Sequence, residues 1–106
     1  MEEAVQITTT ADNRETIENI GRSLVEKRLA ACAQVLGPIK SIYRWKGKIE
    51  ETEEWLCLVK SRKYLWEEIE AEIRRLHPYE LPEITVTTID GGLQGYIQWV
   101  IDETTV

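Results

Sequence analysis

The sequence predicts an α+β protein in which an antiparallel sheet carries two helices on one face. Segments with strand and helix periodicity follow one another as strand, helix, strand, strand, helix, strand, and one further helix ends the order. Residues 41–60 form two β-rich runs that fold back on each other at Lys46-Gly47-Lys48. No internal repeat, low-complexity tract or linker interrupts the 106 residues. We therefore expect a single domain spanning residues 1–106.

The first strand and the first helix follow from the N-terminal pattern. Residues 4–10 alternate apolar and polar side chains, which is typical of a strand. Asp12, followed three residues later by Glu15, resembles a capping box. It indicates a helix that begins there and runs to about Leu29 or Ala30. The apolar side chains that recur at helical spacing are Ile17, Ile20, Leu24, Val25 and Leu29.

A strand of small residues and a long hairpin come next. Residues 30–36 are predicted to form a strand that Gly37-Pro38 ends. In the hairpin, residues 55–59 are apolar on both faces of the predicted strand. One face carries Trp55, Cys57 and Val59, and the other carries Leu56 and Leu58. Because a sheet covered on one side keeps a polar face on the other, we expect a second copy of the chain to cover the second face.

The second half of the chain repeats the strand–helix–strand pattern. Ser61 is expected to cap a helix that ends at His77, because Pro78 disfavours the helical conformation in its predecessor. A final strand spans residues 83–90, and a short amphipathic helix begins at Leu93. The order predicts a ferredoxin-like βαββαβ sandwich with a C-terminal helix.

Charge and composition exclude several classes of function. The formal net charge of -6, from 19 acids and 13 bases, disfavours nucleic acid as a partner because phosphate binding needs a basic surface. We identify neither a signal peptide at the N-terminus nor an apolar stretch long enough to cross a membrane. Two cysteines without close spacing fit free thiols in a reducing compartment, so we expect a cytoplasmic protein.

The single histidine and the two cysteines are the candidates for chemistry. His77 could be a metal ligand or an acid–base group, or a polar residue whose partial charge suits a helix C-terminus. Cys32 and Cys57 could be soft metal ligands, but the apolar neighbours of Cys57 favour a core position for it. The sequence contains no nucleophile elbow and no defensible Ser-His-Asp arrangement, so we predict no enzyme activity.

Two further groups of side chains stand out along the hairpin and beyond it. An acidic cluster is predicted to be a solvated rim of the strand, and it consists of Glu50, Glu51, Glu53 and Glu54. Aromatic residues exceed what a small core needs, and they are Tyr43, Trp45, Trp55, Tyr79 and Trp99. They could line a pocket or stack on a base, but we favour an interface because aromatic residues are enriched there.

Three segments together carry a family resemblance. They read EKRLAACAQV, SIYRWKGKIEETEEW and HPYELPEI, and in this order they resemble the CutA family of divalent-cation tolerance proteins. The resemblance covers nearly the whole chain. It implies a tight homotrimer of ferredoxin-like protomers, similar in architecture to PII signalling proteins, in which the hairpin strands reach across to neighbouring subunits.

The resemblance also implies a function and a site. CutA-like proteins are associated with tolerance to copper and other divalent cations, which implies Cu(II) or another divalent cation as a ligand that is not obligatory. The positions that match candidate metal ligands are Cys32 and His77. The positions that match residues around the intersubunit cleft are Tyr43, Trp45, Lys48, Tyr79 and Glu83.

We therefore predict a non-enzymatic, cytoplasmic homotrimer that binds divalent metal at or near its subunit clefts. The alternative is a PII-like signal-relay or scaffold protein that binds a small metabolite in the cleft and reports to a protein partner. The basic residues Arg44 and Lys48, beside the aromatic residues of the hairpin, motivate that alternative. An enzyme using His77 with Glu80 or Glu83 ranks below both hypotheses, because no second catalytic group is identifiable.

Overall fold

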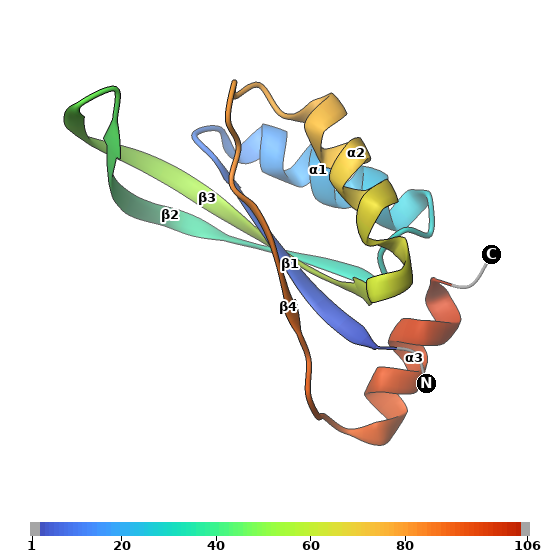
Figure 1. Cartoon of the computed structure of the whole chain (residues 1–106). Helices are drawn as coiled ribbons and strands as arrows, with labels where there is room; N and C mark the ends of the chain where they lie inside the picture. The colour runs from blue at the N-terminus through green and yellow to red at the C-terminus, as the bar shows by residue number, and fades with distance from the viewer. Residues whose placement is uncertain (1–2, 105–106) are drawn as a thin grey trace.

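The sheet has four antiparallel strands in the order β2-β3-β1-β4 (Figure 1). The computed structural model describes residues 3–104. The strands are β1 (Ala4–Ala11), β2 (Cys32–Trp45), β3 (Lys48–Arg62) and β4 (Ile84–Thr88). The helices are α1 (Arg14–Glu26), the short 3-10 helix η1 (Lys63–Leu65), α2 (Trp66–Leu76) and α3 (Gln94–Glu103). This arrangement confirms the predicted ferredoxin-like order with a C-terminal helix.

The core lies between the sheet and the two long helices. Helices α1 and α2 lie side by side on one face of the sheet, and the hairpin of β2 and β3 projects beyond them (Figure 1). Ile7 and Val59 from the sheet are completely buried in one cluster with Ile20 and Ile69 from the helices. The burial of these aliphatic side chains supplies the main hydrophobic stabilisation of the protomer.

Helix α1 has a different N-cap from the one expected from the sequence. Asn13 occupies the cap position, and its side-chain oxygen accepts a hydrogen bond from the backbone N–H of Thr16 at 3.0 Å. The prediction that Asp12 begins a capping box is therefore wrong. The helix also ends earlier than expected, because Arg28 takes a left-handed conformation with φ 60°. The backbone N–H of Leu29 then donates back into the last turn, which closes the helix.

The turn of the hairpin confirms the predicted bend. Strand β2 ends at Trp45 and β3 begins at Lys48, so Lys46 and Gly47 alone form the loop. Both residues have positive φ, 50° and 81°, which is the geometry of a type I′ turn. Glycine removes the steric cost at the second of these positions, so the sequence selects this tight connection.

Strand β2 does not end at Gly37-Pro38, as we predicted from the sequence. The register passes from Leu36 opposite Leu56 to Ile39 opposite Glu54, so one extra residue of β2 is accommodated as a bulge. Proline lacks the N–H that a regular ladder requires, and the bulge absorbs the missing bond. The small-residue strand and the first arm of the hairpin are therefore one continuous strand.

The start of α2 also differs from the prediction. Ser61 does not cap this helix, because it still belongs to β3 and pairs with Val5 of β1. Its hydroxyl donates to the carbonyl oxygen of Leu29 at 2.6 Å and so ties the chain that follows α1 to the sheet. At the other end, His77 is the C-cap rather than the last helical residue, with extended backbone before Pro78.

The two faces of β3 are covered unequally within the protomer. Cys57 and Val59 point toward the helices and are completely buried. Leu56 and Leu58 point to the opposite face, where they are half-buried, and Leu36 beside Leu56 is 49% exposed. The protomer therefore leaves an apolar strip on the face of the sheet that α1 and α2 do not cover.

Candidate functional site

Cys32, the first residue of β2, lies on the face of the sheet away from α1 and α2. It pairs with Lys60, the neighbour of Val59, whose side chain is buried against the helices. The sulfur atom lies 3.6 Å from the hydroxyl oxygen of Tyr96 in α3, and this contact raises the pKa of Tyr96. Cys32 is half-buried, so its thiol combines partial access with a polar neighbour.

Cys57 occupies the core, as predicted. Its side chain is completely buried beneath α1, where the Sγ atom lies 3.4 Å from the position that a Cβ at Gly21 would occupy. Burial, with a smaller contribution from the charge of Cys32, raises the pKa of the Cys57 thiol to about 11. Because the thiolate is the form that binds metal, Cys57 is a poor ligand in this environment.

His77 uses both ring nitrogens to hold the chain in place. Nδ1 accepts a hydrogen bond from the backbone N–H of Tyr79 at 3.1 Å, and Nε2 lies 2.7 Å from the carbonyl oxygen of Thr10. A carbonyl oxygen accepts hydrogen bonds and does not donate them, so Nε2 carries the proton and the ring is in its neutral form. The imidazole therefore joins the segment after α2 to the end of β1 and has no lone pair left for a metal ion in this arrangement.

Cys32 and His77 do not come together within one protomer. Lys60, the partner of Cys32, lies opposite Gln6 of β1, whereas His77 contacts Thr10, four residues further along the same strand. That separation corresponds to about 13 Å along the strand. In the part of the chain that the structure describes, no group of three or more His, Cys, Asp and Glu side chains could hold a metal ion. The two predicted ligands thus belong to different places on the surface of the sheet.

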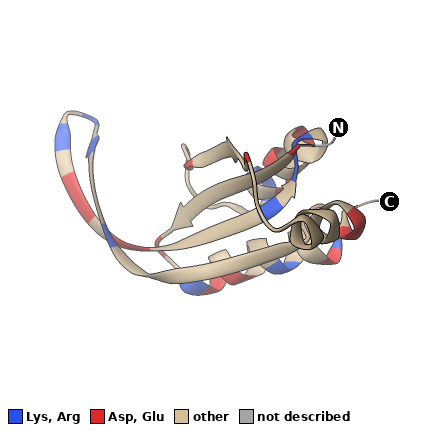
Figure 2. Cartoon of the chain, turned by 90° about the horizontal axis from the view of Figure 1, so that it is seen from below, with Lys and Arg blue, Asp and Glu red and all other residues tan. Residues whose placement is uncertain are grey.

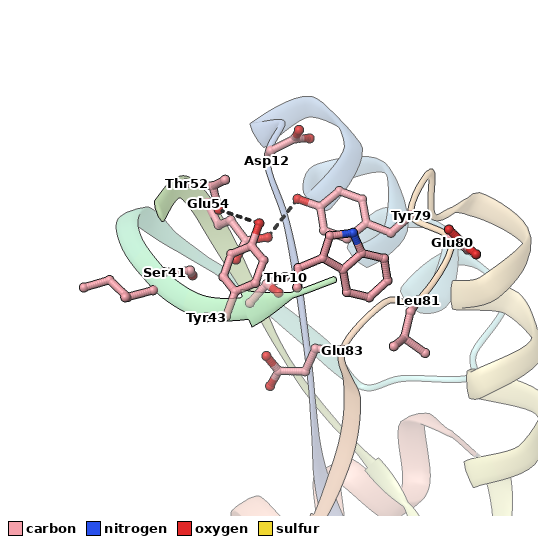
Figure 3. A pocket seen from close by; sticks show the side chains of 12 residues that line it. Thr10, Asp12, Ser41, Tyr43, Thr52, Glu54, Tyr79, Glu80, Leu81 and Glu83 are labelled. Carbon is pink, nitrogen blue, oxygen red and sulfur yellow. Dashed lines mark hydrogen bonds between the residues drawn. The ribbon is translucent and has the colours of Figure 1, made fainter. Parts of the chain in front are cut away.

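A cavity of about 650 Å³ lies between the hairpin and the segment that follows α2 (Figure 3). Its walls come from the end of β1, the middle of the hairpin and the connector between α2 and β4. The lining residues are Thr10, Asp12, Ser41, Ile42, Tyr43, Trp45, Thr52, Glu54, Tyr79, Glu80, Leu81 and Glu83. Aromatic and acidic side chains from distant parts of the sequence therefore share one cavity.

Glu54 is the most deeply buried acid of this cavity. Its exposed fraction is 6%, and one carboxylate oxygen accepts a hydrogen bond of 2.8 Å from the hydroxyl of Tyr79 (Figure 3). Burial raises the pKa of Tyr79, and the neighbouring charges of Glu54 and Asp12 raise it further. Within residues 3–104, no lysine, arginine or histidine forms an ion pair with Glu54. The interior end of the cavity is therefore an electronegative environment.

The cleft residues expected from the resemblance are distributed unevenly around this cavity. Tyr43, Trp45, Tyr79 and Glu83 line it, whereas Lys48 is not among the lining residues. Lys48 lies opposite Trp45 at the base of the hairpin turn. The structure thus brings four of the five side chains to one cavity within a single protomer.

Glu54 is the residue that sequence reasoning misplaced. We predicted it to be part of a solvated acidic rim, but Tyr79 covers it, so this prediction is wrong for Glu54. The signal that could have identified it is its position two and four residues before Leu56 and Leu58, which places it on the same face of the strand. Asp12 and Glu80 also line the cavity, which we did not predict because nothing in their local sequence indicates a shared cavity.

Charge along the hairpin changes sign over a short distance. Figure 2 shows Lys and Arg gathered at the turn and Asp and Glu along the adjoining strand. The basic residues are Lys40, Arg44, Lys46 and Lys48, and the acidic ones are Glu50, Glu51, Glu53 and Glu54. The cavity lining includes none of these bases, and within residues 3–104 no base of the turn forms an ion pair with an acid of the cavity.

Comparison with known proteins identifies the family. The family model described as the CutA1 divalent ion tolerance protein matches residues 5–103. The divalent-cation tolerance protein CutA of Thermus thermophilus is 38% identical over 104 residues, which cover 98% of this chain and 99% of the relative. Protein CutA of Homo sapiens is 42% identical over 91 residues, which cover 86% of this chain and 51% of the relative. The chain thus spans about half the length of the human protein.

The fold agrees with solved structures of this family. The CutA of Archaeoglobus fulgidus, described as a periplasmic divalent cation tolerance protein, superposes with a TM-score of 0.93 at 35% identity, covering 96% of this chain and 99% of the other. Across residues 3–104, no helix is sufficiently long and apolar to cross a membrane. The family description names a tolerance of divalent ions and no enzymatic reaction. The chain belongs to the CutA1 family of divalent ion tolerance proteins.

Proposed function

We propose that the protein binds Cu(II) or another divalent cation and contributes to tolerance of divalent cations as a non-enzymatic, cytoplasmic protein. Membership of a family named for this tolerance is the observation that carries the proposal. The half-buried thiol of Cys32 is the structural observation that supports it, because a deprotonated cysteine binds Zn(II) and other thiophilic metal ions.

We also propose that the working form is a homotrimer. The apolar strip of Leu36, Leu56 and Leu58 on the uncovered face of the sheet supports this assembly. On the projecting hairpin, Ile42 and Ile49 are 64% and 66% exposed. Apolar surface of this kind is stabilised by contact with another chain, and a neighbouring copy would supply it.

The candidate ligands for the metal are Cys32 and His77, acting at separate positions. Cys32 offers a sulfur ligand without loss of a backbone hydrogen bond. A metal ion that binds Nδ1 of His77 would have to break its hydrogen bond with the backbone N–H of Tyr79. A metal ion that binds Nε2 would have to replace the proton that this nitrogen shares with the carbonyl oxygen of Thr10. We therefore expect Cys32 to be the stronger ligand and His77 to bind metal only with local rearrangement.

Native mass spectrometry of the reduced protein, titrated with Cu(II) and Zn(II), tests the assembly and the metal site together. We expect a trimer that takes up three metal ions in discrete steps. Cys32→Ala should lose the first and tightest binding steps, and His77→Gln should retain them. Cys57→Ala is the matched control, because it removes the other thiol from a completely buried position.

Each component of this proposal has a separate outcome that contradicts it. A monomeric mass at working concentration would contradict the trimer. Full copper affinity in the Cys32→Ala/His77→Ala double variant would show that neither residue is a ligand. Diffuse adducts without defined stoichiometry would contradict a specific metal site while leaving the assembly intact.

A second candidate function is a signal-relay or scaffold protein that binds a small metabolite. The cavity of about 650 Å³ favours this candidate, since its size falls in the range that accommodates small organic ligands. A thermal-shift screen of small metabolites tests it, because a ligand that binds the folded state raises the melting temperature. No stabilisation by any compound in the screen would count against it.

A further inference from the structure

The charged residues that line the cavity between the hairpin and the connector after α2 are all acidic. Four of its twelve lining residues are acids, and the lining includes no lysine, arginine or histidine. The acids are Asp12, Glu54, Glu80 and Glu83. Like charges that line one concave surface reinforce each other and attract an ion of opposite sign. The negative charge of the cavity therefore favours a positively charged ligand.

The buried carboxylate of Glu54 lacks a positively charged partner among residues 3–104. A buried carboxylate is unfavourable unless a cation or several hydrogen bonds compensate its charge. Glu54 is 6% exposed, and its recorded hydrogen-bond partner among residues 3–104 is the hydroxyl of Tyr79. A single neutral donor compensates such a charge incompletely. A positively charged ligand group beside Glu54 would complete the compensation.

The aromatic residues of the cavity favour an organic cation. Tyr43, Trp45 and Tyr79 contribute rings to the walls, with Tyr43 and Tyr79 on opposite sides of Glu54 in Figure 3. Aromatic faces attract ammonium groups and at the same time pack against the methylene carbons that connect them. A small inorganic ion has no carbon atoms to pack against these rings.

The spacing of the acids argues against a chelated metal ion in the same place. Throughout residues 3–104, no three His, Cys, Asp and Glu side chains converge closely enough to hold one ion. The cavity is also far larger than the coordination sphere of a single ion. Dispersed acids around a cavity of this size suit a ligand that carries several positive charges separated by short apolar spacers.

We propose that this cavity is a binding site for aliphatic polyamines. An ammonium group would lie beside Glu54, donate hydrogen bonds to its carboxylate and compensate the negative charge. The methylene spacers would pack on Tyr43, Trp45 and Tyr79, and outer ammonium groups would face Glu80 and Glu83. This inference rests on the second candidate function, in which the cavity holds a small organic ligand, and it names the chemical class of that ligand. It is independent of copper binding at Cys32.

Isothermal titration calorimetry of the full chain with spermidine, near neutral pH and at low ionic strength, tests the proposal. We expect saturable binding to the wild-type protein with one site per protomer, and no competition by an equal concentration of Mg²⁺. Glu54→Gln preserves the shape of the side chain and its acceptor for Tyr79, and we expect it to weaken binding by about tenfold or more. Glu83→Gln changes an exposed residue and should weaken binding by about threefold.

Glu67→Gln is the matched control for these variants. Glu67 is an exposed acid in the first turn of α2, outside the cavity, so its replacement changes the net charge by the same amount. Its spermidine affinity should equal that of the wild type. Trp45→Leu adds a test of the aromatic wall, because it removes the ring without altering charge and should also weaken binding.

Three results would overturn the proposal. They are the absence of saturable spermidine binding to the wild type, equal weakening by Glu67→Gln and Glu54→Gln, and displacement of spermidine by Mg²⁺ at equal concentration. The last of these would indicate an inorganic cation site. Copper uptake measured on the same Glu54→Gln sample separates this inference from the metal proposal, since uptake that depends on Cys32 should be unchanged.

Discussion

Glu72 and Glu54 are withdrawn from solvent to almost the same degree, with exposed fractions of 7% and 6%, but their surroundings differ completely. Glu72 lies on α2 where this helix faces α1. Its carboxylate receives two hydrogen bonds from Arg75 at 2.7 and 2.9 Å, one from Ser23 at 2.5 Å, and an ion pair with Lys27 at 3.0 Å. These contacts, with Arg75 contributing most, lower the pKa of Glu72 to about 2.

Glu54 lies on the hairpin and faces a cavity instead of a second helix. Its carboxylate accepts a hydrogen bond from the phenol of Tyr79, whereas that of Glu72 contacts two cations and a serine hydroxyl. The difference separates the two regions of the molecule. Between the helices, two cations compensate the charge of the buried glutamate and stabilise the fold. On the hairpin, no cation among residues 3–104 pairs with Glu54, which favours a ligand or a neighbouring chain as its partner.

The largest expected effect comes from removing the charge of Glu72. We expect Glu72→Gln to lower the free energy of unfolding by roughly 2 kcal/mol, because it weakens several charge-assisted hydrogen bonds at a buried position. Chemical denaturation near neutral pH at fixed protein concentration measures this change. The same substitution at Glu54 is the matched control. Equal destabilisation by both variants would remove the contrast between the two glutamates.

The pH dependence of stability sharpens the contrast further. Folding lowers the pKa of Glu72 from 4.5 to about 2, so the stabilisation by its charge is fully present above pH 4.5. It is lost as the pH falls through this window, because the folded state must then take up a proton that the unfolded state already binds. The difference in unfolding free energy between wild type and Glu72→Gln should therefore shrink below pH 4.5 and approach zero near pH 2. A difference that stays constant across the window would contradict this linkage.

The smallest expected effect is that of Glu54→Gln without a ligand. Since no cation among residues 3–104 pairs with Glu54, removing the charge should change the free energy of unfolding by no more than about 0.5 kcal/mol, with a slight gain as the favoured direction. Thermal and chemical denaturation of the ligand-free protein measure it. A loss as large as that of Glu72→Gln would show that Glu54 is compensated by contacts beyond Tyr79.

Most features of the fold could be predicted from the local sequence. The tight turn at Lys46-Gly47 and the break before Pro78 follow from backbone preferences of single residues, so they could be predicted from a few letters. Prediction was weaker where two local signals compete. Asp12 and Asn13 are both good N-cap residues, and the structure uses Asn13. Ser61 is a residue type that often caps helices, but here it remains in β3. Its pairing with Val5 and its hydrogen bond to Leu29 stabilise the strand more than a helix cap would stabilise α2.

The candidate site depends on contacts that the sequence does not encode locally. Glu54 is separated from Tyr79 by 25 positions, and the end of β1 is far from both in the chain. Their meeting requires α2 to return the chain to the hairpin, after which His77 fixes the connector to Thr10. The burial of Glu54 is therefore a property of the assembled sheet and connector.

The sequence by itself determined the alternation of strands and helices, the hairpin turn, the burial of Cys57 and the family. These features rest on periodicity, backbone preference and motif order, which act over a few residues or over the whole chain at once. The tertiary structure alone decided that Cys32 and His77 lie apart, that the ring of His77 is occupied, and that Glu54 is buried beneath Tyr79. Each of these depends on which distant side chains become neighbours, and on how much charge and hydrogen bonding those neighbours supply.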